Sequence, residues 1–134
     1  MGKALPDIEY MLLPGALNGL YDKQTHTIYI DPRLDPPTTR ATLVHELVHA
    51  ERGDTACCDA WFHAKQELTV ERAAAMRLIS TDDLIAGVRE TCDDRHLAAW
   101  LEVDLDMLNT RIGILTAAER RVIEEEVDRL GRTA

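Results

Sequence analysis

Two histidines and a glutamate form the pattern His45-Glu46-x-x-His49 within residues 42–53. The apolar residues around them recur with helical spacing, and residues four apart in a helix project from the same face. His45 and His49 can therefore share one metal ion. Glu46 projects about 100° further round the helix axis, from where its carboxylate can reach a metal-bound water without binding the metal. The pattern predicts a zinc site with two histidine ligands and a glutamate general base, which is metalloprotease chemistry.

A catalytic zinc site needs a third protein ligand and an open position for water. A second helix, expected over about residues 59–79, offers Glu67 and Glu71, which lie four residues apart on one face. His63 continues that face one turn earlier, and as a fourth ligand it would close the site and make it structural. The residue pattern leaves Glu67 and Glu71 as alternatives. His63 and Tyr29 are also candidates to stabilise an oxyanion.

The elements that must position these residues indicate an α+β fold. Strands are expected at 8–13, 17–21 and 25–30, and the last two flank Asp22-Lys23-Gln24, which is typical of a hairpin. We therefore expect a small N-terminal antiparallel sheet packed on the metal helix, followed by a mainly helical C-terminal half. Strand 25–30 is expected either as a plain sheet edge or as an edge that receives the substrate as an added strand.

Helix ends are marked by short polar residues and glycines. Thr38 or Thr39 is expected to cap the metal helix, and Gly53 to end it. Ser80 begins another helix, and the capping box from Thr116 to Glu119 begins the last one. Between these lie two short helices whose arrangement around residues 97–108 is similar to a helix-turn-helix.

Charge and composition narrow the class of protein. The 134 residues are 46% hydrophobic and carry a net charge of −9, which argues against non-specific binding to nucleic acid or anionic membranes. Residues 81–134 hold seven arginines against thirteen acidic residues, so we do not expect this segment to bind DNA directly. We expect it to pack within the protein or to contact another protein. The first residues lack a signal-peptide layout, and no run is long enough for a membrane span. Three cysteines, with Cys57 and Cys58 adjacent, suit a reducing cytoplasm.

Residues 42–54, preceded by the hairpin and followed by residues 66–79, resemble the ImmA/IrrE family of metallopeptidases, and in particular the short forms of actinobacteria and their phages. In that family the downstream helix carries Glu-x-x-Ala-x-x-Phe-Ala-x-x-Leu-Leu-x-Pro, and its Glu is the third metal ligand. The pattern fits with its Glu at Glu67 and its last Leu at Leu78. A start at Glu71 matches fewer positions, so the resemblance favours Glu67 and keeps Glu71 as the alternative.

The resemblance implies a zincin-like metallopeptidase core over residues 1–80. The helix pattern adds a helix-turn-helix-like extension over residues 81–134, and we expect the two parts to pack as one compact unit. The resemblance also implies one Zn²⁺ per chain and a cytoplasmic endopeptidase in a bacterial host cell. The implied substrate is a helix-turn-helix transcriptional repressor, or a similar regulatory protein of a phage or mobile element.

Two other interpretations remain open. The chain could be a non-proteolytic, anti-repressor-like protein that binds the regulator and keeps only the metallopeptidase scaffold. The second alternative is a purely structural zinc site, in which the metal would have no open coordination position for water. Glu46 favours the enzyme, because a scaffold that only binds has no physical need for a general base.

Overall fold

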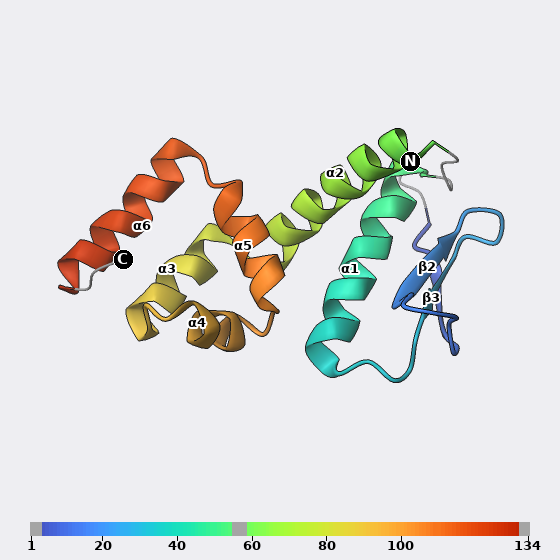
Figure 1. Ribbon diagram of the computed structural model, residues 1–134, viewed down its shortest axis with the longest axis horizontal. Helices are drawn as coiled ribbons and strands as arrows, with labels where there is room; N and C mark the ends of the chain where they lie inside the picture. Colours follow the sequence, from blue (N-terminus) through green and yellow to red (C-terminus); the bar gives the residue numbers. More distant parts are fainter. Residues whose placement is uncertain (1–3, 55–58, 132–134) are drawn as a thin grey trace. The chain divides into compact units, whose positions relative to one another are not determined.

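The computed structural model describes residues 4–54 and 59–131, and it has the expected α+β class (Figure 1). Three short strands come first: β1 (Asp7–Tyr10), β2 (Gly19–Asp22) and β3 (Thr27–Ile30). The helices α1 (Pro36–Arg52) and α2 (Ala60–Leu78) follow. The chain divides into two compact units, residues 1–74 and residues 75–134, with the boundary inside α2. The packing of a C-terminal extension on the core stays a prediction.

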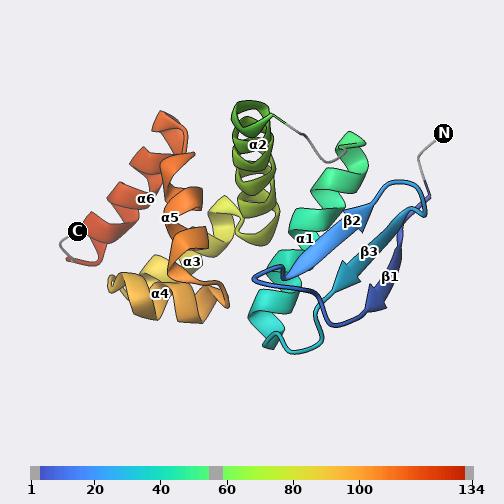
Figure 2. The ribbon, with the colours of Figure 1, turned by 45° about the vertical axis from the view of Figure 1, so that its right-hand side comes forward.

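The sheet is mixed, which corrects the expectation of an antiparallel one. Its strand order is β1-β3-β2, with β2 antiparallel to β3 and β1 parallel to β3 (Figure 2). A tight turn forces β2 and β3 to be antiparallel. The longer connection over residues 11–18 instead passes the C-terminal end of β3, where the Met11 N–H donates to the Ile30 carbonyl (3.1 Å) and the Asp31 N–H to the Asn18 carbonyl (2.9 Å). β1 therefore pairs with the edge of β3 that is opposite to β2.

The central position of β3 overturns both expectations for residues 25–30. With β1 on one side and β2 on the other, β3 is neither a plain edge nor an edge that can receive a substrate strand. The side chains of Ile28 and Ile30 are fully buried in the first unit. The edge of the sheet next to α1 is β2 (Figure 2).

Helix α1 begins earlier than expected. Its N-cap is Asp35, whose Oδ1 accepts a hydrogen bond from the Thr38 N–H at 2.8 Å, so the expected cap at Thr38 or Thr39 was wrong. Pro36 and Pro37 occupy the first helical positions, where proline is favoured because its φ angle is already helical and no N–H is needed there. The helix ends as predicted at Gly53, which adopts the left-handed conformation at φ +70°.

The second unit consists of helices α3 (Thr81–Glu90), α4 (Asp94–Leu101), α5 (Leu105–Gly113) and α6 (Ala117–Arg129), together with the end of α2. The helix start at Ser80 and the capping box from Thr116 to Glu119 are both confirmed. The structure adds that Ser80 also forms a capping box, completed by Asp83. The hydrophobic core of this unit consists of Ile79, Leu84, Val88, Leu97, Ala98, Leu101, Val103 and Leu108.

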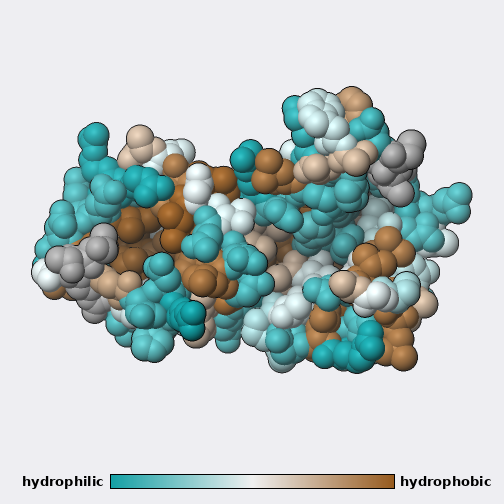
Figure 3. All heavy atoms as spheres, viewed as in Figure 1, coloured by the Kyte–Doolittle hydropathy of each residue, from teal (hydrophilic) through white to brown (hydrophobic). Residues whose placement is uncertain are grey.

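The face of the molecule in Figure 3 is mainly hydrophilic and carries separate apolar patches. None of the helices within the described ranges has the length and apolar character that a membrane span requires. Cys92 carries a free, exposed thiol, whereas Cys57 and Cys58 lie outside the described residues.

Candidate metal centre

The structure brings His45, His49 and Glu67 together between α1 and α2. Glu67 Oε2 lies 3.0 Å from His45 Nε2, and Glu67 Oε1 lies 2.9 Å from His49 Nε2. One potential ligand atom from each of the three residues lies within 4.8 Å of the other two. Two imidazole nitrogens and a carboxylate oxygen are the donor types that zinc accepts in catalytic sites. These three residues can therefore hold one metal ion.

Packing between the two helices selects Glu67 over Glu71 as the acidic member of this group. Val48 of α1 packs against Val70 and Ala74 of α2 in a small buried cluster. This contact turns the face that carries Glu67 toward α1, so its carboxylate is half-buried. Glu71 lies one turn further along and is exposed. The geometry thus agrees with the residue that the family resemblance favours.

Glu46 is buried beside the two histidines, with 8% of its surface exposed. Burial raises the pKa of its carboxyl group and outweighs the opposing effect of His45 and His49. The negative charge of Glu67 raises the pKa further, while a hydrogen bond from the backbone N–H of Tyr21 lowers it. A carboxylate with a raised pKa is suited to accept and release a proton.

Strand β2 sets the space that is available to Glu46. A Cβ atom at Gly19 would lie 2.5 Å from Thr42 Cγ2 and 3.2 Å from Glu46 Cγ, so only glycine lets the strand approach α1 this closely. Gly19 and Tyr21 belong to the same short strand, and Tyr21 supplies the backbone donor to the Glu46 carboxylate. The sheet edge thus determines where the candidate base lies.

Asp54 contacts the metal cluster from outside it, and the sequence interpretation assigned this residue no part in the site. Its Oδ2 lies 2.9 Å from His49 Nδ1 and 3.0 Å from Arg52 Nε. Burial acts to raise the Asp54 pKa, but the hydrogen bonds from His49 and Arg52 outweigh it and lower the pKa. Gly53 is the feature of the sequence that could have indicated the contact between Asp54 and His49. A left-handed residue after a helix turns the chain back over the last helical turn, where His49 lies.

The two candidate oxyanion donors lie in different surroundings. His63 is exposed on α2, one turn before Glu67. Tyr29 lies in β3, where neighbouring side chains alternate between the two faces of the sheet. Its neighbour Ile30 pairs with Gly19, the position that faces α1, so Tyr29 points away from the metal helix. This placement does not support Tyr29 as an oxyanion stabiliser, and the part of His63 stays a prediction.

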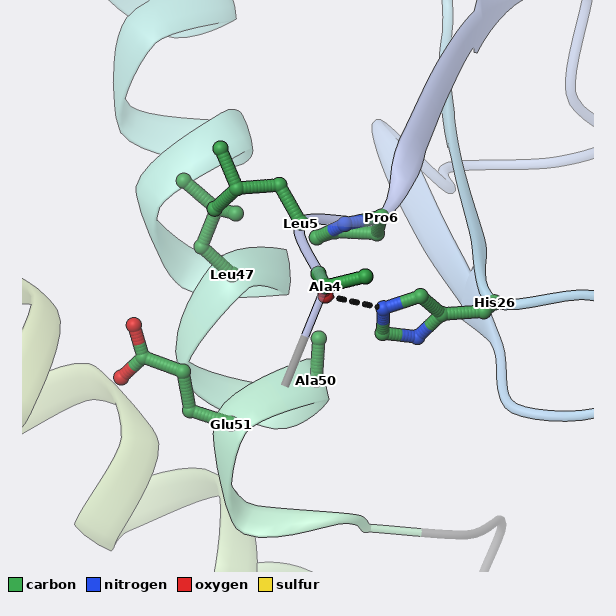
Figure 4. Close-up of a pocket in the computed structure, with 7 residues that line it drawn as sticks. All are labelled: Ala4, Leu5, Pro6, His26, Leu47, Ala50 and Glu51. Carbon is green, nitrogen blue, oxygen red and sulfur yellow. Dashed lines mark hydrogen bonds between the residues drawn. The ribbon is translucent and has the colours of Figure 1, made fainter. Parts of the chain in front are cut away.

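A pocket of about 270 Å³ lies between α1, His26 and the N-terminal segment, and Figure 4 shows its lining residues. The His26 ring donates from Nε2 to the Ala4 carbonyl at 2.7 Å and thereby holds the N-terminal segment along one wall. Leu47 and Glu51 of α1 line the pocket and project from the helix roughly opposite to His45 and His49. The pocket is therefore separate from the metal cluster.

Two histidines and Glu67, with the buried carboxyl group of Glu46 beside them, form a site of the metallopeptidase type. The family model of the IrrE N-terminal-like domain, of peptidase family M78, matches residues 11–113, about three quarters of the chain, and the chain belongs to this family. Membership confirms the resemblance drawn from the sequence and places the protein among hydrolases of the metallopeptidase type. Searches of curated proteins and of solved structures found no significant match.

Proposed function

We propose that this protein is a zinc-dependent endopeptidase that cuts a regulatory protein, with a helix-turn-helix repressor of a phage or mobile element as the best candidate substrate. One observation carries the enzymatic part. The candidate ligand atoms of His45, His49 and Glu67 converge within 4.8 Å of one another, next to the buried carboxyl group of Glu46.

The donor set fits zinc. Donors at zinc distances of about 2.0–2.2 Å in a tetrahedral site lie roughly 3.3 Å apart. The carboxylate of Glu67 lies between the two histidines, with one oxygen 3.0 Å from His45 Nε2 and the other 2.9 Å from His49 Nε2, so donor atoms from all three residues are close enough to share one ion. Two histidines and a carboxylate also suit iron or manganese, and the His-Glu-x-x-His pattern favours zinc. When bound, zinc would polarise the scissile carbonyl and lower the pKa of a water molecule.

The residues of the chain supply the proton transfers. Glu46 takes a proton from the attacking water at its carboxylate and returns it to the nitrogen of the leaving amine. The backbone N–H of Tyr21 keeps this carboxylate beside the histidines, and burial keeps bulk water from competing for it. His63, which lies one turn before Glu67, is the candidate donor to the developing oxyanion.

Charge supports a DNA-binding regulator as the substrate. The chain carries a net charge of −9, whereas a protein that binds DNA presents a basic surface. Opposite net charges accelerate the encounter of two proteins and disfavour acidic competitors. Family resemblance supports the same class of substrate.

Elemental analysis of the purified, tag-free protein tests the site. We expect about one zinc per chain in the wild type, in E71A and in E46Q, and loss of zinc in H49A and E67A. Loss in E71A and retention in E67A would move the third ligand by one helical turn. A wild-type protein that stays metal-free after zinc addition would contradict the proposed function.

Cleavage is tested in cells that carry the prophage or mobile element, by comparing new protein N-termini after expression of the wild type or of E46Q. We expect the wild type to produce a new N-terminus within a helix-turn-helix repressor and E46Q to produce none. If E46Q releases repression as fully as the wild type does, the protein disables its partner by binding alone.

A further inference from the structure

The His49 side chain lies between two carboxylates. Its Nε2 faces Glu67 Oε1 at 2.9 Å, and its Nδ1 faces Asp54 Oδ2 at 2.9 Å. The Asp54 side chain is 11% exposed, so solvent has little access to this contact. His49 and Asp54 are also joined through the backbone, because the Asp54 N–H donates to the His49 carbonyl at 3.1 Å.

This arrangement determines which nitrogen of His49 can bind a metal. A proton on Nδ1 donates to Asp54, and the lone pair of Nε2 then points at the cluster. A histidine ligand needs its ring orientation and its tautomer fixed in this way, and a carboxylate partner also makes the ring a stronger donor.

We propose that Asp54 is a positioning residue of the metal centre, which orients His49 and directs its Nε2 to the metal; this rests on the proposed function. Asp54 acts through His49 and is not itself a ligand, because the group that could hold the metal consists of His45, His49 and Glu67. Gly53 makes the contact possible by adopting the left-handed conformation that returns the chain over the end of α1.

A rival explanation is that Asp54 only stabilises the C-terminal end of α1 through its ion pair with Arg52 (3.0 Å). The two explanations differ in what they predict for metal binding. An ion pair at the helix end affects the stability of the metal-free protein. A partner of His49 affects the affinity for zinc and the geometry of the bound metal.

The experiment measures the dissociation constant of Zn²⁺ for the full chain by competition with a chromophoric chelator. The test variants are D54N and D54A. R52A removes the ion pair and leaves the contact between His49 and Asp54. D35A removes the cap at the other end of the same helix and controls for helix destabilisation. The melting temperature of each metal-free variant and the visible spectrum of each Co²⁺-loaded variant are recorded in parallel.

We expect zinc affinity to fall about 10-fold in D54N and up to about 100-fold in D54A. The Co²⁺ spectrum of D54A should change, whereas R52A and D35A should keep the affinity and the spectrum of the wild type. Wild-type affinity in D54A would overturn the proposal, and so would losses in D35A and R52A that match the loss in D54A. A wild-type chain that binds no zinc would overturn the proposed function and, with it, this proposal. A wild-type chain that binds zinc with the same affinity as D54A would overturn this proposal alone.

Discussion

At the residue scale, the position of Glu46 depends on a residue that has no side chain. Strand β2 approaches α1 at Gly19, and the atom that a Cβ at this position would meet first is Thr42 Cγ2. Gly19 therefore sets the distance between the sheet edge that donates to Glu46 and the helix that carries Glu46. A residue with no chemistry of its own thus shapes the candidate active site.

Replacing Gly19 by alanine should destabilise the protein by about 1–3 kcal/mol, as overpacking of a tight contact does. The added carbon would lie 2.5 Å from Thr42 Cγ2, so the strand or the helix must shift. T42S removes this methyl group, and G19A/T42S should recover part of the loss in urea unfolding followed by circular dichroism. G113A, at a glycine with no heavy atom within 4 Å of the added carbon, is the control. Wild-type stability of G19A would disprove the tight contact.

At the element scale, two glutamates tie α6 into the helical unit. Glu119 accepts hydrogen bonds from the Thr81 hydroxyl and from the Thr116 backbone, which lower its pKa to about 2. Glu126 pairs with Arg129 and with Arg89, and these contacts lower its pKa to about 2 as well. Both glutamates therefore bind their partners as carboxylates.

Because these two pKa values are depressed, the stabilisation that they give is fully present above about pH 4.5, the ordinary glutamate pKa. It is lost as the pH falls from there toward 2. The melting temperature of the helical unit should therefore fall over this range, and E119Q/E126Q should flatten the fall. E125Q, at an exposed position of the same helix, should follow the wild type. An equally steep fall in the double variant would contradict this account.

The guanidinium of Arg111 holds α5 against the junction of α2 and α3. It is 2% exposed, its Nε donates to the Ile79 carbonyl at 2.6 Å, and its Nη2 donates to Thr81 Oγ1 at 3.1 Å. R111A leaves a buried carbonyl unpaired and opens a cavity, so we expect a loss above about 2 kcal/mol in urea unfolding. R121A, on the exposed surface of α6, should change stability by less than about 0.5 kcal/mol. Equal effects of the two variants would refute this.

At the scale of the whole molecule, the candidate ligands all belong to one of the two compact units. His45 and His49 lie on α1, and Glu67 lies on the part of α2 that precedes the boundary at Ala74. A metal would therefore cross-link two helices of the first unit and leave the second unit with its own core.

Metal removal should loosen the first unit selectively. A ligand present at 100 times its dissociation constant stabilises the form that binds it by about 2.7 kcal/mol. Hydrogen exchange of the zinc-loaded and chelator-treated protein should therefore differ most in α1 and in α2 up to Ala74. The core helices α3 to α5 should exchange alike in both samples, and H49A should exchange like the chelated protein with or without zinc. A uniform change along the chain would show that the two units unfold together.

Local features were readable from the sequence because they depend on residues within one or two helical turns. The pattern at His45, the end of α1 at Gly53, the helix start at Ser80 and the capping box at Thr116 belong to this kind. So does the α+β class, since the change from strand-like to helical periodicity is itself a local pattern. The N-cap of α1 was wrongly assigned to Thr38 or Thr39, which are also residues that commonly cap helices. Pro36 and Pro37 favour the first helical positions, and this makes Asp35 the N-cap.

The strand order and the completed site were decided only by the tertiary structure. Whether β1 pairs with β2 or with β3 depends on the path of the loop over residues 11–18, which strand patterns do not encode. Glu67 and Glu71 lie on one face of α2, and the packing of Val48 on Val70 and Ala74 distinguishes them by setting which turn of that face lies opposite the two histidines. Sequence thus determined which residues can do chemistry, and tertiary packing determined which of them meet, because contacts between distant segments depend on how whole helices and strands pack.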